Sequence, residues 1–466
     1  MVLEMINYLK KSKGKETIYH CLYIGSIITL LSFAIFKVLY TTCLYADGSN
    51  YFQLILSRQK FYLHDNSRNF ILLLSQWPLV FGIDIGIKNV RVLAMLFSLG
   101  YVFWEIFYFM LTIYYSYKLK EYKFMVYTIV IFTLTHIFTG FFIMLESLAA
   151  VGIFWFLLLF FIHYSQLYNR VPKWFVCFTV ILSVKVYESF AFFGIVLLLT
   201  IFNKKLWKRK EKLFILGISV LLAYASFQGF RYVIWPRDPV NAKGALQSIL
   251  SLDYRLIATY VLLFIIFIFS ILINYAKDTK KRKTFNNCLC FLNLVCGCWF
   301  AYLMFFNTDY IATESYNSRI TNLAFPLALS LVVLFIYIKK IDFSLSRLTC
   351  VLGILLISNL WFNFKSAYDY NQHLQKTYEI TSMNEGIIPA NKVDLSNIKK
   401  YYWPWTMMFE SVNAQMVNGV YNIKCIIIHD EWYNSWEPFD TKDILSYPDL
   451  TYYNVTYLND TLKRHD

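Results

Sequence analysis

Charged side chains are scarce in this sequence: Asp, Glu, Lys and Arg make up 16% of its 466 residues, while 58% are hydrophobic. A soluble domain needs more polar surface than this, so a soluble fold is excluded. The hydrophobic residues come in a series of blocks of 17 to 29 residues, and a membrane-spanning helix needs about 20 such residues. The sequence therefore predicts an all-α polytopic membrane protein.

No disulfide framework, internal repeat or low-complexity linker is visible in the sequence. Of the nine cysteines, Cys288, Cys290, Cys296 and Cys298 form two C-x-C pairs within one apolar block. Residues i and i+2 point to different faces of a helix, so buried thiols are favoured over a metal site. A basic N-terminus precedes the 23-residue block Ile18–Tyr40, which lacks a small-residue cleavage site. This block is therefore predicted to be a retained first span rather than a signal peptide.

The net charge of +15 would suggest nucleic acid as a partner of a soluble protein, but its placement indicates otherwise. With the N-terminus in the cytoplasm, the short cytoplasmic segments hold 23 Lys or Arg, and the opposite loops hold far fewer. This is the positive-inside asymmetry of membrane proteins. A membrane is therefore the expected partner, and nucleic acid is not.

The apolar blocks predict about eleven spans. One block, Trp174–Phe202, has 29 residues, too many for one straight span and too few for two full ones. Two short helices that meet near Lys185–Glu188 keep the charge asymmetry intact, and such a break is tolerated only where it lines protein or a water-filled cavity. The other spans are predicted at Ile18–Tyr40, Val90–Tyr117, Phe124–Leu145, Leu148–Tyr168, Leu213–Val233, Leu256–Ala276, Phe285–Phe306, Ile320–Ile338 and Leu348–Phe364.

Two regions are predicted from this pattern. Residues 1–364 form the multi-span domain, and its first loop, 41–89, carries two surface helices at Ser49–Lys60 and Ser67–Phe81, with Asp65-Asn66-Ser67 as a cap for the second. Residues 365–466 are polar and include a strand-like run at Lys424–Ile428. They are expected to form a small extracytoplasmic α/β domain at the C-terminus.

Asp47 is the candidate catalytic residue. It lies in Tyr45-Ala46-Asp47-Gly48, just beyond the end of the first predicted span, and Gly48 permits a tight backbone path beside it. A carboxylate there is suited to act as a general base toward an attacking hydroxyl. Position alone favours the alternative of an ordinary turn or cap residue, and the neighbouring charges favour the catalytic interpretation.

Charged residues of both signs are predicted on the same side of the membrane as Asp47. Guanidinium groups and ammonium groups suit phosphate recognition. Each arginine alone is also explained as a headgroup anchor, whereas Lys185 interrupts an apolar block and is a functional candidate by its position. The acids are equally well explained by ion pairing. The candidate substrate-binding residues are Arg58, Arg68, Glu146, Lys185, Glu188, Glu314 and Arg319.

These features together resemble the GT-C superfamily of polytopic membrane glycosyltransferases. The resemblance rests on a first span that leads into an acidic motif, surface helices in the first loop, many further spans and a terminal extracytoplasmic domain. The stretch Tyr45–Leu79, with Arg68 and Gln76-Trp77-Pro78, and the stretch Lys185–Ser189 look like bacterial members.

The resemblance implies an inverting sugar transfer from a polyprenyl-phosphate donor to a glycan, lipid or protein acceptor at the cell surface. It implies Asp47 as the base and the outer-face cations as the phosphate site. It also implies a bacterial cytoplasmic membrane, and the charge asymmetry places the N-terminus inside and the C-terminus outside. Many members have two adjacent acids in the first loop, whereas Asp47 stands alone, so a divalent metal is possible but not indicated and no cofactor is predicted.

Three other functions are compatible with the sequence. A transporter or lipid flippase is favoured by Lys185 and the interrupted block, but such proteins often contain internal repeats and midplane sites. A glycan polymerase or ligase would share the same substrates. A non-catalytic assembly subunit would tolerate substitution of every outer-face charge.

Overall fold

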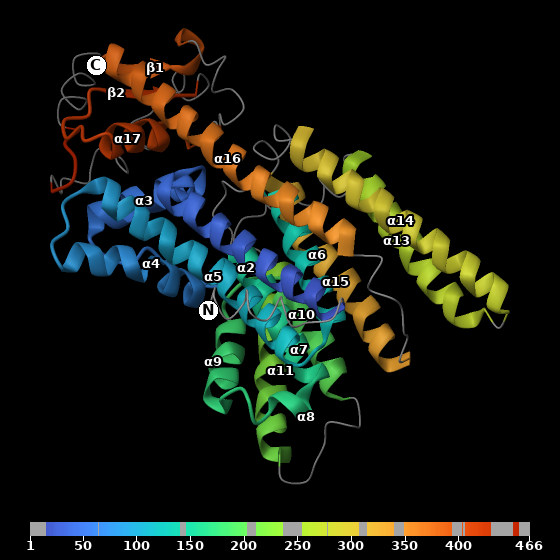
Figure 1. Ribbon diagram of the computed structural model, residues 1–466. Helices are drawn as coiled ribbons and strands as arrows, with labels where there is room; N and C mark the ends of the chain where they lie inside the picture. Colours follow the sequence, from blue (N-terminus) through green and yellow to red (C-terminus); the bar gives the residue numbers. More distant parts are fainter. Residues whose placement is uncertain are drawn as a thin grey trace.

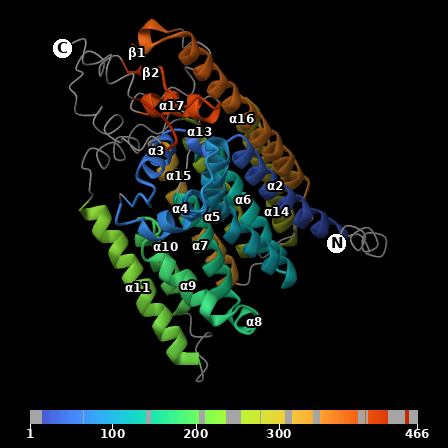
Figure 2. The ribbon, with the colours of Figure 1, turned by 90° about the vertical axis from the view of Figure 1, so that its left-hand side faces the viewer.

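The computed structural model describes residues 15–63, 65–139, 146–202, 211–235, 254–276, 278–306, 315–339, 349–393, 403, 406–429 and 451–455. These residues are predominantly helical, with one two-stranded sheet (Figure 1). Two views show α3 and α17 near one end of the molecule and α8 at the opposite end (Figures 1 and 2).

The first half of the chain, up to residue 235, contains most of the packed core. Its helices are α2 (Lys15–Leu39), η1 (Thr42–Leu44), α3 (Asp47–Arg58), α4 (Asn69–Asp84), α5 (Val90–Lys118), α6 (Tyr122–Thr139), α7 (Glu146–Ile162), α8 (Tyr164–Leu167), α9 (Lys173–Ser183), α10 (Phe190–Ile201) and α11 (Lys212–Ile234).

The second half adds the remaining long helices and the sheet. Its elements are α13 (Tyr254–Tyr275), α14 (Thr279–Phe306), α15 (Ser315–Lys339), α16 (Thr349–Met383), β1 (Gly386–Pro389), η6 (Ala390–Lys392), α17 (Met407–Val417) and β2 (Cys425–Ile428).

The prediction of a helical membrane protein agrees with four helices among the described residues that are long and apolar enough to cross a membrane. They are Thr17–Leu39, Val90–Lys118, Lys212–Ile234 and Thr279–Leu303. The predicted number of spans and their orientation remain predictions.

Helix α7 forms the centre of the core. Every residue from Glu146 to Phe161 is buried, as expected for a helix that is hydrophobic on all sides. It packs against α5, α10 and α15. Glu146 is the first residue of this helix, so a carboxylate sits at the end of the most buried element.

The predicted break in Trp174–Phe202 is confirmed. Helix α9 ends at Ser183 and α10 begins at Phe190, so the residues between them, which include Lys185 and Glu188, do not continue either helix. The backbone N–H of Phe70 donates a 3.2 Å hydrogen bond to the carbonyl oxygen of Lys185. The break is thus covered by the start of α4, as backbone groups inside a protein require.

Both predicted helices of the first loop are present as α3 and α4, but the predicted cap is wrong in detail. Arg68, not Asp65 or Ser67, is the residue that precedes α4, and its side chain does not cap the helix. Asp65 instead accepts a 2.8 Å hydrogen bond from the backbone N–H of Ser67. Residues along one face of α4 are exposed and apolar, namely Phe70, Leu73, Trp77 and Phe81, which fits a helix lying on a membrane surface.

The predicted strand is present as β2, which pairs in parallel with β1. Helix α16 has 35 residues and is continuous from Thr349 to Met383, so the predicted domain boundary after residue 364 falls inside a helix. Figure 1 shows α16 running from the side of α13 and α14 to the strands. The chain therefore passes from the helical bundle to the C-terminal elements along one unbroken helix.

Gly100 sets the packing of α4 on α5, because a Cβ at this position would overlap the carbonyl oxygen of Ser75. We expect Gly100→Ala to lower the free energy of unfolding by about 1–3 kcal/mol, since a rigid backbone would have to shift. Gly217→Ala in α11 is the matched control, because nothing lies within 4 Å of its Cβ position. Helix propensity predicts that this control raises stability by about 0.5–1 kcal/mol. Thermal unfolding in detergent measures both, and equal stabilisation would contradict the close packing.

Candidate functional site

The backbone around Asp47 follows an unusual path that its sequence allows. Thr41 and Ala46 both have positive φ values, 50° and 51°, and the 3₁₀ turn η1 lies between them. Helix α3 then begins at Asp47. A Cβ on Gly48 would overlap the carbonyl oxygen of Cys43, so only glycine fits after Asp47. The backbone conformation of Tyr45-Ala46-Asp47-Gly48 therefore determines where the Asp47 side chain leaves the main chain.

Arg68 is the centre of the charged cluster near Asp47. Its Nη2 lies 3.2 Å from Oε1 of Glu188, its Nη1 lies 3.6 Å from Oε2 of Glu146, and its Nε lies 3.7 Å from Oδ2 of Asp65. The guanidinium carbon also lies 4.5 Å from the centre of the Tyr187 ring. One cation thus joins carboxylates from the first loop, from α7 and from the break after α9.

The electrostatics of this cluster keep Arg68 positively charged. Burial lowers its pKa, but Glu188, Glu146 and Asp65 raise it, and the net effect lies well above the ordinary value. Ser67 completes the arrangement, because its hydroxyl donates to Glu188 at 2.8 Å and to Asp65 at 2.6 Å.

Glu146 is the least solvated acid of the cluster. It lies in the turn between the predicted spans Phe124–Leu145 and Leu148–Tyr168, and it is 4% exposed. Its Oε1 makes no hydrogen bond within the described part of the chain. Burial raises the pKa of Glu146 to about 7; Arg68 opposes this shift, and the charge of Asp47 adds to it. The charge of Asp47 therefore acts on Glu146, an acid that is distant from it in sequence.

The other predicted site residues do not all join this cluster. Lys185 lies near the start of α4, with its Nζ 5.9 Å from the centre of the Phe70 ring. Arg58 ends α3, about 16 Å along the helix from Asp47 at 1.5 Å per residue, and stacks over Tyr62. Arg319 lies in α15, but its side chain is outside the described residues, as is all of Glu314.

The balance of charge differs from the predicted phosphate site. Arg68 contacts Asp65, Glu146 and Glu188, so its positive charge is balanced by neighbouring acids in this structure. Sequence reasoning placed the cations together and gave the acids a secondary role. In the folded chain the acids outnumber the cations around Arg68.

Sequence reasoning missed one buried ion pair and one buried contact between a histidine and a glutamate. Nζ of Lys37 in α2 lies 2.9 Å from Oε2 of Glu105 in α5. Nε2 of His373 in α16 lies 3.1 Å from Oε2 of Glu410 in α17. Ionisable residues inside apolar blocks are functional candidates by default, and that signal was available for Lys37 and Glu105. No local signal distinguishes His373 or Glu410.

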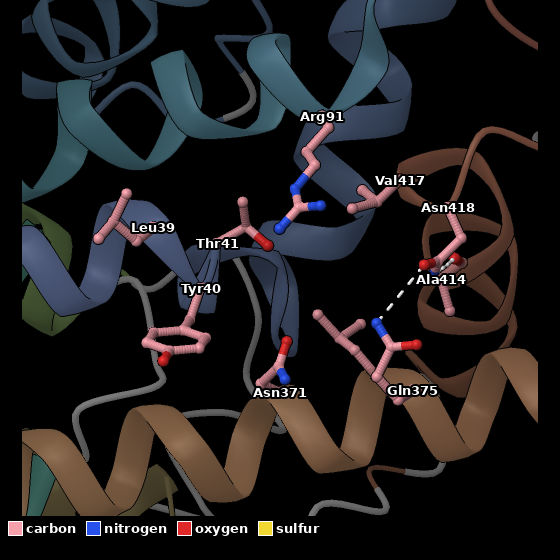
Figure 3. Close-up of a pocket in the computed structure, with 10 residues that line it drawn as sticks. Leu39, Tyr40, Thr41, Arg91, Asn371, Gln375, Ala414, Val417 and Asn418 are labelled. Carbon is pink, nitrogen blue, oxygen red and sulfur yellow. Dashed lines mark hydrogen bonds between the residues drawn. The ribbon is translucent and has the colours of Figure 1, made fainter.

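A small surface cavity lies where the first loop meets the C-terminal elements. Thr41, Arg91, Asn371, Gln375 and Asn418 are among the residues around it (Figure 3). They come from the end of α2, from α5, from α16 and from the end of α17. None of the predicted site residues lines this cavity.

Within the described ranges, no group of three or more His, Cys, Asp or Glu residues is arranged to hold a metal ion. Comparison with models of protein families, with curated proteins and with solved structures finds no match to this chain. The geometry of the site therefore carries the functional inference by itself.

The buried Glu146 carboxyl predicts a pH dependence of stability. Because its pKa is raised to about 7 in the folded chain from 4.5, the folded state holds one more proton between these values, and stability falls as pH rises through this window. Gln is neutral throughout, so we expect Glu146→Gln to gain stability relative to the parent between pH 5 and 8, by up to about 3 kcal/mol.

Thermal unfolding in detergent across this pH range tests the expectation. Glu379→Gln is the control, because Glu379 is half exposed and lies outside the cluster around Arg68. A difference between Glu146→Gln and the parent that does not change with pH would contradict the raised pKa.

Proposed function

We propose that this chain is an inverting membrane glycosyltransferase that moves a sugar from a polyprenyl-phosphate carrier to a hydroxyl acceptor outside the cytoplasm. The partners would be the lipid-linked donor, a glycan, lipid or protein acceptor, and the membrane itself. The observation that carries the proposal is the position of Asp47, beside the end of the first apolar helix and within electrostatic reach of Glu146, which in turn contacts Arg68.

The proposed reaction uses two carboxyl groups in unlike environments. Asp47 is partly exposed and serves as the general base, whereas Glu146 is buried with a raised pKa. Asp47 takes the proton of the acceptor hydroxyl while the oxygen of that hydroxyl attacks the anomeric carbon of the donor. The bond from that carbon to the phosphate oxygen breaks, and the carrier phosphate leaves with the electron pair. Direct displacement inverts the anomeric centre.

Arg68 is the cation best placed to receive the leaving phosphate. Its contact with Glu146 is 3.6 Å, longer than the 2.7–2.9 Å typical of a charge-assisted hydrogen bond. This side of the guanidinium is therefore only weakly engaged by protein. A donor phosphate would bind there in place of the weak Glu146 contact, with Lys185 as a second charge near the start of α4.

Asp47→Asn tests the proposed base. The variant keeps the shape of the side chain but cannot take a proton, so we expect the rate of transfer to fall by about 10²–10⁴-fold. The assay measures transfer from radiolabelled polyprenyl-phosphate sugars in proteoliposomes, with expression and donor binding unchanged. Asp84→Asn, at the exposed end of α4, is the control and should retain full activity. Full activity of Asp47→Asn would end the proposal.

A transporter or lipid flippase is the second candidate, and the Lys37–Glu105 pair favours it. Both side chains are almost fully buried, at 0% and 2% exposure, between α2 and α5. Charged pairs at such positions occur in substrate and proton pathways of transporters. A pair that only joins two helices is the alternative expected for an enzyme.

Substitution of this pair separates the two candidates. Glu105→Leu alone should destabilise the chain by about 3–5 kcal/mol, because Lys37 would remain buried without its partner. The double variant Lys37→Met with Glu105→Leu should recover most of that stability and should keep transfer activity. A transporter would instead show flux of labelled lipid or sugar in proteoliposomes, and the double variant would abolish that flux.

A further inference from the structure

The C-terminal elements contain a buried carboxylate that contacts the backbone immediately before Asp47. Glu410 is 1% exposed. Its Oε1 accepts a 3.1 Å hydrogen bond from the backbone N–H of Ala46 and a 2.8 Å hydrogen bond from the hydroxyl of Thr406. Its Oε2 lies 3.1 Å from Nε2 of His373. Ala46 and Glu410 are 364 residues apart in sequence.

Ala46 needs such a contact because of its conformation. Its φ of 51° with ψ of −130° is a combination that glycine adopts readily and that a residue with a Cβ rarely adopts. Strained backbone of this kind persists only where the surrounding structure holds it. Since Asp47 is the next residue, the ψ angle of Ala46 sets the direction in which α3 begins and the starting point of the Asp47 side chain.

Contacts on both sides of Asp47 belong to the same C-terminal surface. Before it, the ring of Tyr45 meets those of Tyr370 and Trp403 edge to face, each with centroids 6.1 Å apart. After it, the side chain of Asn413 donates a 3.0 Å hydrogen bond to the carbonyl oxygen of Ser49. The Asp47 segment is therefore held from residue 45 to residue 49 by α16, α17 and Trp403.

We propose that Glu410 is a positioning residue for Asp47: by binding the Ala46 N–H, it holds the strained backbone from which the Asp47 carboxylate is presented. The catalytic part of this inference rests on the proposed function, whereas the structural part does not. His373 and Thr406 keep the Glu410 carboxylate oriented toward Ala46. The C-terminal elements would thus complete a site whose other residues lie in the first half of the chain.

The next residue of α17 offers a matched control. Ser411 is fully buried like Glu410, but its hydroxyl accepts a 3.2 Å hydrogen bond from the backbone N–H of Ile427 in β2. Loss of Ser411 would loosen the C-terminal elements among themselves. Loss of Glu410 would loosen their hold on the first loop.

Hydrogen exchange of the full chain in detergent, read by mass spectrometry, tests the contact without any substrate. We expect Glu410→Ala to speed exchange in a peptide covering residues 42–48 by about tenfold or more, because the Ala46 N–H loses its acceptor. Glu410→Gln keeps an acceptor oxygen and should stay within about threefold of the parent. Ser411→Ala should leave this peptide unchanged and speed exchange in residues 425–428. Unchanged exchange at 42–48 in Glu410→Ala would overturn the proposal.

Steady-state kinetics with a radiolabelled polyprenyl-phosphate hexose test the consequence for Asp47. We expect Glu410→Ala to lower kcat by about tenfold or more with little change in KM, because a displaced base slows the chemical step and leaves donor binding intact. Adding Ala46→Gly to this variant should restore part of the lost kcat, since glycine adopts the required φ without assistance. Ser411→Ala should keep the parental kcat.

The outcomes separate the two proposals. Lost protection at residues 42–48 with parental kcat would overturn the positioning role. Parental activity in Asp47→Asn would instead overturn the proposed function, and the exchange result would still decide whether Glu410 holds Ala46. If Glu410→Ala does not fold, Glu410→Asp replaces it, because it keeps a carboxyl group and withdraws it from Ala46 by one methylene. The same faster exchange at 42–48 is then expected, and its absence would overturn the contact.

Discussion

Arg68 joins three separate parts of the chain through its carboxylate partners. Asp65 belongs to the first loop, Glu146 begins the central helix α7, and Glu188 lies in the break between α9 and α10. A buried guanidinium is tolerated only when it is paired, and buried carboxylates have the same requirement. Each group therefore depends on the others, and together they fix the start of α4 to the core. The Phe70 N–H bond to Lys185 adds a neutral contact at the same junction. The Asp47 segment is held separately, by α16, α17 and Trp403.

The two acids of the proposed site, Glu146 and Asp47, lie in different surroundings. Glu146 has lost most of its solvation at the end of α7, so its protonated form is favoured. Asp47 begins a helix, where the positive end of the helix dipole favours the ionised form of a first-turn acid. Two acids in different surroundings, with charges that act on each other, thus lie on this side of the molecule. Sites of this composition are typical of acid–base chemistry.

Sequence patterns predicted the local features of this fold. The length and interruption of one apolar block predicted the break between α9 and α10, and helical spacing of apolar residues predicted α3 and α4. Asp47, Arg68, Glu146 and Glu188 were identified from their places near span ends. Hydropathy marks only the part of a helix that is apolar, so the continuation of α16 past residue 364 was missed. Contacts between distant residues, such as Glu410 with Ala46, leave no local pattern, because both partners look ordinary in their own segments. Arg58 ends α3, so the length of this helix, which the spacing did predict, separates Arg58 from Asp47.

The unbroken helix α16 has a mechanical consequence. Its 35 residues extend about 52 Å at 1.5 Å per residue, whereas the hydrocarbon core of a bilayer is about 30 Å thick. The helix begins in the last predicted span and carries His373, the partner of Glu410, on its far part. A helix of this length tilts as a unit when the bilayer around its first, membrane-spanning part becomes thinner or thicker. A change in bilayer thickness would then be transmitted along α16 to the Glu410 carboxylate that binds the Ala46 N–H, so the surrounding bilayer would help to set the geometry around Asp47.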